Sequence, residues 1–211
     1  MKNNLTEMVF ILDASGSMHG LEADTIGGFN SMIDKQKAQP GEAYVSTVVF
    51  NTASKVVHDR LPLKRVSMLT ERDYCVSGCT ALYDAIGDAV KHIGNIHKYA
   101  RREDVPEKTL FIITTDGLEN ASTRYDRNTV RMLIERQKEK HGWEFLFLGA
   151  NIDAESEAEK IGIGREYAAT YRSDKEGTRL NYEVLSEAMS SVRANCEIPE
   201  GWADSIRSRD D

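Results

Sequence analysis

Oxygen-bearing side chains gather in three short segments that stand at the end of a predicted strand or at the start of a predicted helix. The first strand ends in Asp13-Ala14-Ser15-Gly16-Ser17, which carries Asp13, Ser15 and Ser17. Thr80 opens the most regular amphipathic helix, and Asp116 follows another apolar strand. In open α/β sheets, ligands bind outside the carboxyl ends of the strands, so we expect the three segments to converge.

The chemistry of this set suits a hard divalent cation. Mg²⁺ prefers oxygen ligands in near-octahedral geometry and keeps several waters. Ser15, Ser17 and Thr80 offer neutral hydroxyls, whereas Asp13 and Asp116 offer charge and can orient water. If the direct ligands are mostly hydroxyls, the ion keeps much of its positive charge. A carboxylate from another molecule is then a favourable further ligand.

Each of these residues also has an ordinary structural interpretation. Asp13, Ser15 or Ser17 could cap a helical turn, and Thr80 could be the N-cap of its own helix. Asp116 with Gly117 resembles a turn signal. The three segments occur together and in order on suitable elements, and this combination favours the metal site over the separate interpretations.

Other polar residues near the strand ends have weaker claims. Asn151 and Asp153 follow a later strand and suit helix capping, with a place on a partner surface as the alternative. Glu119 and Asn120 are expected to be loop residues, with a role around the site as the alternative. His19 follows Ser17 without a recognisable orienting acid, so we expect it on the exposed rim and not in a hydrolase site.

The elements that must position the site alternate between strands and helices. Apolar runs predict strands at Glu7–Asp13, Ala43–Asn51, Ser54–Leu61, Lys108–Thr115, Trp143–Ala150 and Tyr167–Tyr171. Helical periodicity is clearest from Leu82 to Ile96 and predicts further helices at Ile26–Ile33, Val130–Ile134, Ala154–Ile161 and Leu185–Val192. Phe29, Met32 and Tyr83 are expected in the core.

Two features of these strands predict the architecture. Several strands are apolar on both faces, which is typical of a parallel sheet covered by helices. The two runs around Thr52-Ala53 are joined so tightly that only an antiparallel hairpin fits. We therefore expect a doubly wound, Rossmann-like three-layer α/β sandwich, mostly parallel with one antiparallel edge strand and with helices on both faces.

The three segments together resemble the metal-ion-dependent adhesion site (MIDAS) of von Willebrand factor A (VWA) domains. That motif combines D-x-S-G-S, a threonine at a helix start, and T-D-G after a strand. The resemblance extends over roughly residues 5–195, since the order of strands and helices is similar too. It implies that Ser15 and Ser17 bind Mg²⁺, or Mn²⁺ in its place, directly. Thr80 would bind directly or through water, and Asp13 and Asp116 would act through water or as anchors.

Finer matches are similar to stand-alone cytoplasmic VWA proteins of bacteria and phages, some of them related to tellurite-resistance and conflict systems. They lie at Asp13–Met18, Thr115–Ser122 and Phe147–Asp153. This resemblance implies a non-enzymatic module whose ion accepts an Asp or Glu carboxylate from a partner protein, in a stress-response or conflict-related complex. Two alternatives remain open: a metal-dependent hydrolase or phosphatase in the same cleft, and a regulatory subunit of an ATPase or kinase assembly.

Composition sets the outer limits of these hypotheses. The 211 residues fit one domain over 1–200, with 201–211 as a short polar tail that we expect to fray from Ala203 onward. A net charge of −7 argues against general nucleic-acid binding. Neither a membrane span nor an export signal is visible, so the cytoplasm is the expected compartment. Cys75, Cys79 and Cys196 are expected to be reduced thiols, with a disulfide or metal role as the alternative.

Overall fold

A computed structural model describes residues 2–194 and 197–208, and within these ranges it contains one sheet of six strands. The order across the sheet is β3-β2-β1-β4-β5-β6, and β3 alone runs antiparallel, against β2. The strands are β1 (Lys2–Asp13), β2 (Glu42–Phe50), β3 (Ser54–Pro62), β4 (Pro106–Thr115), β5 (Glu144–Ala150) and β6 (Ala168–Tyr171). The predicted mixed sheet with one antiparallel edge strand is confirmed.

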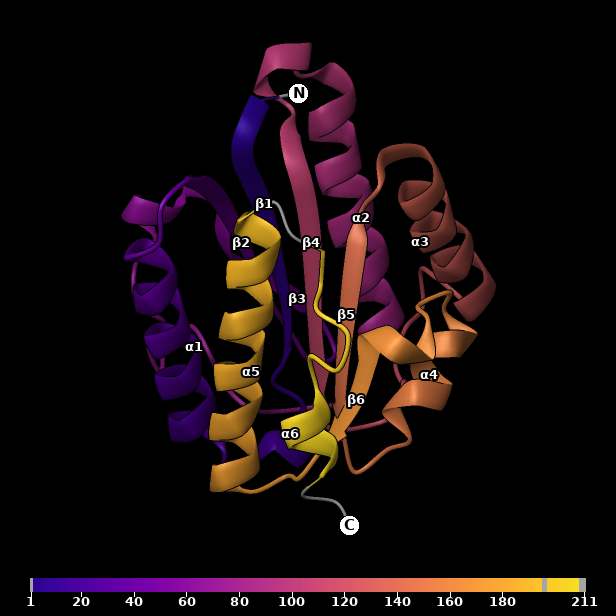
Figure 1. The fold of residues 1–211 in the computed structure, drawn as a ribbon. Helices are drawn as coiled ribbons and strands as arrows, with labels where there is room; N and C mark the ends of the chain where they lie inside the picture. Colours follow the sequence, from indigo (N-terminus) through magenta and orange to yellow (C-terminus); the bar gives the residue numbers. More distant parts are fainter. Residues whose placement is uncertain (1, 195–196, 209–211) are drawn as a thin grey trace.

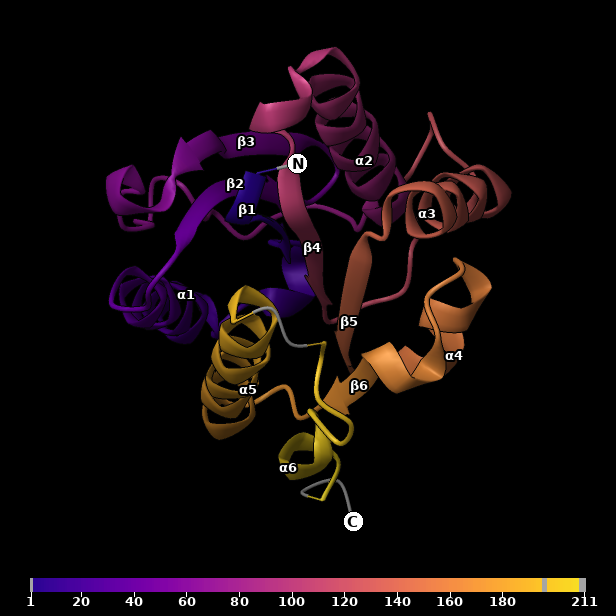
Figure 2. The same cartoon turned by 45° about the horizontal axis from the view of Figure 1, so that its top comes forward.

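Helices cover both faces of this sheet, which completes the predicted three layers (Figures 1 and 2). On one face lie α1 (Glu22–Lys37), α5 (Lys175–Arg193) and α6 (Asp204–Arg207); on the other lie α2 (Leu82–Tyr99), α3 (Arg127–His141) and α4 (Ala154–Lys160). Short 3-10 turns occur at Gly16–Met18, Leu63–Arg65, Arg102–Asp104 and Arg165–Tyr167. No helix in the described ranges is long and apolar enough to cross a membrane.

The central strands are buried on both sides, as their continuous apolar sequence predicts. Along β1, Met8 and Phe10 belong to the cluster under α1 and α5, whereas Val9 and Ile11 belong to the cluster under α2 and α3. All four side chains are fully buried. Side chains in a strand alternate between faces, so one apolar run supplies both cores.

The pairing of β1 with β4 determines where chemistry can occur. The two strands are parallel neighbours, with Leu12 opposite Thr114, so Asp13 and Asp116 emerge at the same carboxyl edge. The chain builds outward in opposite directions from this pair, through β2 and β3 on one side and β5 and β6 on the other. Such a reversal of strand order is where open α/β sheets bind ligands.

The C-terminal segment differs from the frayed polar tail expected from residue 203 onward. It forms the short helix α6, in which Ile206 is buried, and Ala203 just before it is buried as well. The Trp202 indole N–H donates to the carbonyl of Glu166 at 2.8 Å. A few well-spaced apolar side chains among charged ones are enough to dock one helical turn, and a composition-based expectation overlooks them. Residues 209–211, and Cys196, lie outside the described residues.

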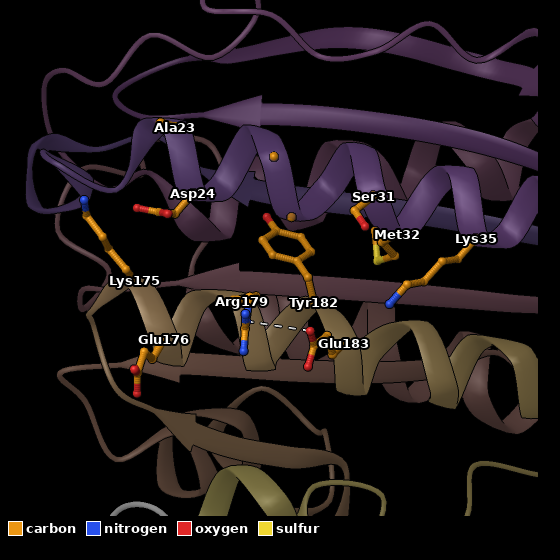
Figure 3. A pocket seen from close by; sticks show the side chains of 12 residues that line it. Ala23, Asp24, Ser31, Met32, Lys35, Lys175, Glu176, Arg179, Tyr182 and Glu183 are labelled. Atoms are coloured by element: carbon orange, nitrogen blue, oxygen red, sulfur yellow. Dashed lines mark ion pairs between the residues drawn. The ribbon is translucent and has the colours of Figure 1, made fainter.

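Two adjacent glycines in α1 face different surroundings. Figure 3 shows the Tyr182 ring directed from α5 towards α1, beside a groove of about 440 Å³ between the two helices. A Cβ atom on Gly28 would lie 2.3 Å from the Tyr182 ring, whereas a Cβ on Gly27 would have no neighbour within 4 Å. Close packing of α1 on α5 therefore requires glycine at one position and only tolerates it at the other.

We expect the two alanine substitutions to change stability in opposite directions. Gly28→Ala should lower the free energy of unfolding by about 1–3 kcal/mol, because the methyl group overpacks the buried ring. Gly27→Ala should raise it by about 0.5–1 kcal/mol through the better helix propensity of alanine. Urea unfolding followed by circular dichroism measures both. Equal effects of the two variants would show that α1 and α5 are not packed in this way.

Candidate metal site

The two carboxylates of the predicted site are buried at the carboxyl edge of the sheet. Asp13 is 1% exposed and Asp116 is 2% exposed. Asp13 accepts the backbone N–H of Ser15 at 2.7 Å through Oδ1 and the hydroxyl of Thr115 at 2.6 Å through Oδ2. Oδ2 is thus held by the last residue of β4 and Oδ1 by the loop just after β1, so the sheet pairing and that loop together orient this carboxylate.

The hydroxyls of Ser15 and Ser17 lie side by side in front of these acids. The 3-10 turn Gly16–Met18 brings their Oγ atoms to 3.1 Å, and the Ser17 hydroxyl donates to Oδ1 of Asp116. Ser15 is buried and Ser17 is exposed, so the pair reaches from the core to the surface. Ser15 is the N-cap residue of the turn but makes no side-chain capping hydrogen bond, which argues against the capping interpretation.

Thr80 reaches the same place from the start of α2. It precedes Ala81, the N-cap residue of the helix, so it does not serve as that cap itself. A Cβ atom placed on Gly117 would lie 3.5 Å from Oγ1 of Thr80 and 3.6 Å from Oγ of Ser17. Both hydroxyls therefore adjoin the residue that follows Asp116. The structure brings together all five residues that the sequence predicts.

The loop before α2, which contains Tyr74 and Gly78, contacts the segment Asp13–Ser17 and supports its conformation. The Gly16 N–H donates to the carbonyl of Gly78 at 3.1 Å, and the Tyr74 hydroxyl donates to the carbonyl of Asp13. Gly78 has a φ of +71°, and a Cβ there would lie 2.5 Å from the Thr52 hydroxyl. Glycine is required at this position because a side chain would both strain the backbone and collide with Thr52.

Sequence reasoning expected loop roles for Glu119 and Asn120, and the structure supports the alternative of a role around the site. Oδ1 of Asn120 accepts the N–H of Thr80 at 2.9 Å, and the Asn120 N–H donates to the Thr80 carbonyl at 3.0 Å. The Glu119 carboxylate accepts the N–H of Tyr83, 36 residues away, at 2.8 Å. Helix α2 has no side-chain cap from its own N-cap residue, Ala81, so these contacts replace a local cap. The sequence itself offers Thr80 as a capping residue and gives no signal for Glu119 or Asn120.

The two buried carboxylates favour binding of a cation. Burial raises the pKa of Asp13 despite its hydrogen bonds. Burial also raises the pKa of Asp116, and the nearby charge of Asp13 adds to this increase. Among the described residues, no Lys, Arg or His forms an ion pair with either acid. Oδ2 of Asp116 is buried without a hydrogen-bond partner, and such an atom is costly unless something binds it.

The kind of donor also fits a hard cation. The site combines two carboxylates with three hydroxyls, and oxygen donors of this type suit Mg²⁺ or Mn²⁺. Among residues 2–194 and 197–208, no three His, Cys, Asp or Glu side chains gather in a way that would hold a metal ion. Binding at this edge would therefore depend on the serine and threonine hydroxyls. Cys75 and Cys79 are exposed free thiols, as expected.

The remaining candidates lie apart from this constellation. Asp153 caps α4 by accepting the N–H of Ser156 at 2.9 Å, as predicted, and Asn151 is exposed. His19 is 88% exposed and pairs with Glu22, which agrees with a rim position. Phe29 and Met32 are buried in the core, and Tyr83 is partly buried against it. The groove of Figure 3 is lined by none of the five site residues.

In the metal-free protein, Asp116→Asn should raise the free energy of unfolding near pH 7 by about 1 kcal/mol, because it removes a buried charge that lacks a cation. The raised pKa means that the wild-type acid destabilises the fold above that pKa and becomes neutral below it. The advantage of the variant should therefore shrink as the pH falls. Thermal unfolding of both proteins in EDTA, repeated from neutral to acidic pH, measures this difference in stability.

Asp126→Asn is the matched control for this experiment. Asp126 caps α3, and its hydrogen bonds to Thr129 lower its pKa, so the same substitution there should not stabilise the protein at neutral pH. A stabilisation that is equal at both positions, or one that does not depend on pH, would contradict the explanation by buried charge.

Comparison with known proteins supports the fold. The sequence matches no protein-family model and no curated protein. Proximal thread matrix protein 1 (PTMP1) from the mussel byssus, in a structure with a zinc-occupied MIDAS motif, is similar with a TM-score of 0.58 and 18% identity. A von Willebrand factor type A structure from Catenulispora acidiphila is similar with a TM-score of 0.57 and 16% identity. Both matches cover 88% of this chain but only 46% and 42% of those proteins, so the chain spans less than half of their length. The chain therefore has a VWA-like α/β fold.

Proposed function

We propose that this protein is a metal-ion-dependent interaction module. Mg²⁺ or Mn²⁺ would be held by Asp13, Ser15, Ser17, Thr80 and Asp116, and a partner protein would add an Asp or Glu carboxylate. One observation carries the proposal: within residues 2–194 and 197–208, two buried acids without a cationic partner stand beside three hydroxyls, and Oδ2 of Asp116 has no hydrogen-bond partner. The VWA-like fold supports the same conclusion.

The hydrogen bonds of the five residues indicate which role each would have in holding the metal ion. Asp13 is occupied by the N–H of Ser15 and by the hydroxyl of Thr115, so it orients the site and supplies charge. Asp116 accepts from Ser17 through one oxygen and has the other available. The three hydroxyls then form the neutral part of the ligand set. A divalent cation bound there would balance the charge of the two carboxylates and would accept an external acid as a further ligand.

The outward side of the site suits a protein partner. Ser17 is exposed, and Leu118, two residues after Asp116, is 54% exposed. A single exposed leucine is ordinary at a protein surface, so the accessible hydroxyl of Ser17 is the feature that supports a partner here. A carboxylate carried on such a partner would reach the site from the side of Ser17, since the other four residues are buried.

We propose that the module is not an enzyme and that it acts as part of a larger complex. His19, the nearest histidine in sequence to the serines, is highly exposed and pairs with Glu22, so it is not held as a general base for Ser15 or Ser17. The resemblance to stand-alone bacterial and phage VWA proteins supports a cytoplasmic stress-response or conflict-related setting. Mg²⁺ and Mn²⁺ both suit this oxygen ligand set, and the zinc-occupied motif of PTMP1 makes Zn²⁺ a third ion to test.

The metal site is tested by isothermal titration of the apo protein with Mn²⁺, Mg²⁺ and Zn²⁺. Ser17→Ala should weaken Mn²⁺ binding by about 10-fold or more, and Asp13→Ala should abolish it. Ser17→Ala also removes the hydroxyl that donates to buried Asp116, so we expect it to lower the free energy of unfolding by about 1–3 kcal/mol, and the titrations are made on protein shown by circular dichroism to be folded. Ser31→Ala, at an exposed serine of α1, is the control and should bind like the wild type. Normal Mn²⁺ binding by both site variants would reject the proposed site.

The partner is tested by capture on the immobilised protein from a bacterial lysate, with and without EDTA, followed by mass spectrometry. A partner that uses an acid on the ion should be retained with Mn²⁺ and lost with EDTA. It should be equally absent from Ser17→Ala beads and present on Ser31→Ala beads. Substituting its acidic residues by amides should then remove binding, since a neutral amide loses the charge-assisted contact. Partners that are indifferent to both EDTA and Ser17→Ala would argue against the mechanism.

A further inference from the structure

Thr80 differs from the other site residues in how it is held. Asp13 and Asp116 are fixed by the pairing of β1 with β4, and the two serines follow directly from β1. Thr80 comes from the loop before α2, and Asn120 holds its backbone at two points. The Thr80 N–H donates to Oδ1 of Asn120 at 2.9 Å, and the Thr80 carbonyl accepts the Asn120 N–H at 3.0 Å.

This two-point contact continues into the first turn of α2. The N–H of Tyr83 donates to Glu119, and the N–H of Asp84 donates to the Ser122 hydroxyl at 3.0 Å. In return, the Asp84 carboxylate accepts the N–H groups of residues 123, 124 and 125. The loop after β4 therefore supplies the capping groups that α2 lacks locally. It ties the start of α2 to the segment that begins at Asp116.

We propose that Asn120 is a positioning residue of the metal site, acting through Thr80; this inference rests on the proposed function. Thr80 is 3% exposed, so its N–H has little access to water once the Asn120 acceptor is removed. The backbone would then shift to find another acceptor, and the Thr80 hydroxyl would move with it. Ligand geometry that loosens by a fraction of an ångström is enough to weaken a metal site. Asn120 itself is exposed and contributes little to the core.

The inference separates affinity for the metal from stability of the fold. Asn120→Leu removes the side-chain acceptor, and we expect Mn²⁺ affinity to fall about 10-fold or more in calorimetric titrations of fully folded protein. Asn120→Asp keeps an acceptor oxygen at the same place. If this acceptor is the feature that positions Thr80, the Mn²⁺ affinity of Asn120→Asp should be within about 3-fold of the wild type. A purely structural role would lower the melting temperature in EDTA and leave the Mn²⁺ affinity of the folded protein unchanged.

Asn30 offers a matched control, because it makes the same kind of contact elsewhere. Oδ1 of Asn30 accepts the N–H of Leu69 at 2.7 Å, and its Nδ2 donates to the Leu69 carbonyl at 3.0 Å. Leu69 belongs to the core cluster on the α1 face and is not one of the site residues. Asn30→Leu should therefore lower the melting temperature in EDTA while leaving Mn²⁺ affinity as in the wild type.

A double-mutant cycle tests whether Asn120 acts through Thr80. Thr80→Val removes the hydroxyl, so adding Asn120→Leu to it should produce little further loss of Mn²⁺ affinity. Additive losses would overturn the inference, as would wild-type affinity in Asn120→Leu. If that variant does not fold, the same comparison is made between Asn120→Ala and Asn120→Asp. If the wild-type protein binds neither Mn²⁺ nor Mg²⁺, the proposed function fails, whereas absence of only the Asn120 effect overturns this inference and leaves that function intact.

Discussion

Two carboxylates buried at one edge of a parallel sheet, without a cationic partner among the described residues, are the constraint around which this site is built. The parallel pairing of β1 and β4 brings Asp13 and Asp116 together whatever their mutual repulsion. Hydrogen bonds from Ser15, Thr115 and Ser17 offset part of the cost of burying the two charges. They do not offset all of it, because the pKa of both acids stays raised and one oxygen of Asp116 has no partner. In the function proposed here, a hard cation would supply what is missing.

The way this charge is compensated also explains the chemistry of the surrounding loops. Side chains with hydroxyls can donate to a carboxylate and still present a lone pair to an ion, which a lysine or an arginine cannot do. An ammonium group in place of Ser17 would neutralise Asp116 and leave no affinity for metal. Glycine at 78 lets the supporting loop approach closely enough to bond Gly16. The site therefore keeps its acids in an unfavourable state, which binding of the proposed ion would relieve.

The sequence predicts the parts of this structure that depend on local pattern. Continuous apolar runs identify β1 and β4, and the carboxyl-edge rule brings Asp13 and Asp116 together before any coordinates are known. The contacts made by Asn120 cannot be predicted in this way, because they join residues 40 apart and depend on how α2 meets the loop after β4. The docking of Ile206 cannot be predicted for a related reason: α6 packs against β6 and α5, which a local sequence pattern does not reveal, and the local composition is polar. Tertiary contacts decide both cases.

The two sides of the site thus differ in rigidity for a physical reason. Asp13, Ser15 and Asp116 are attached to the central strands, whose backbone hydrogen bonds and two apolar faces resist displacement. Thr80 is attached to the exposed residue Asn120 by one side-chain and one backbone hydrogen bond, and such isolated bonds open more easily than a buried ladder. Any change in how well the ion is held should therefore arise on the Thr80 side. Asp13 and Asp116 at the strand ends supply a fixed negative charge. The loop after β4 would determine how completely the oxygen ligands surround a bound ion.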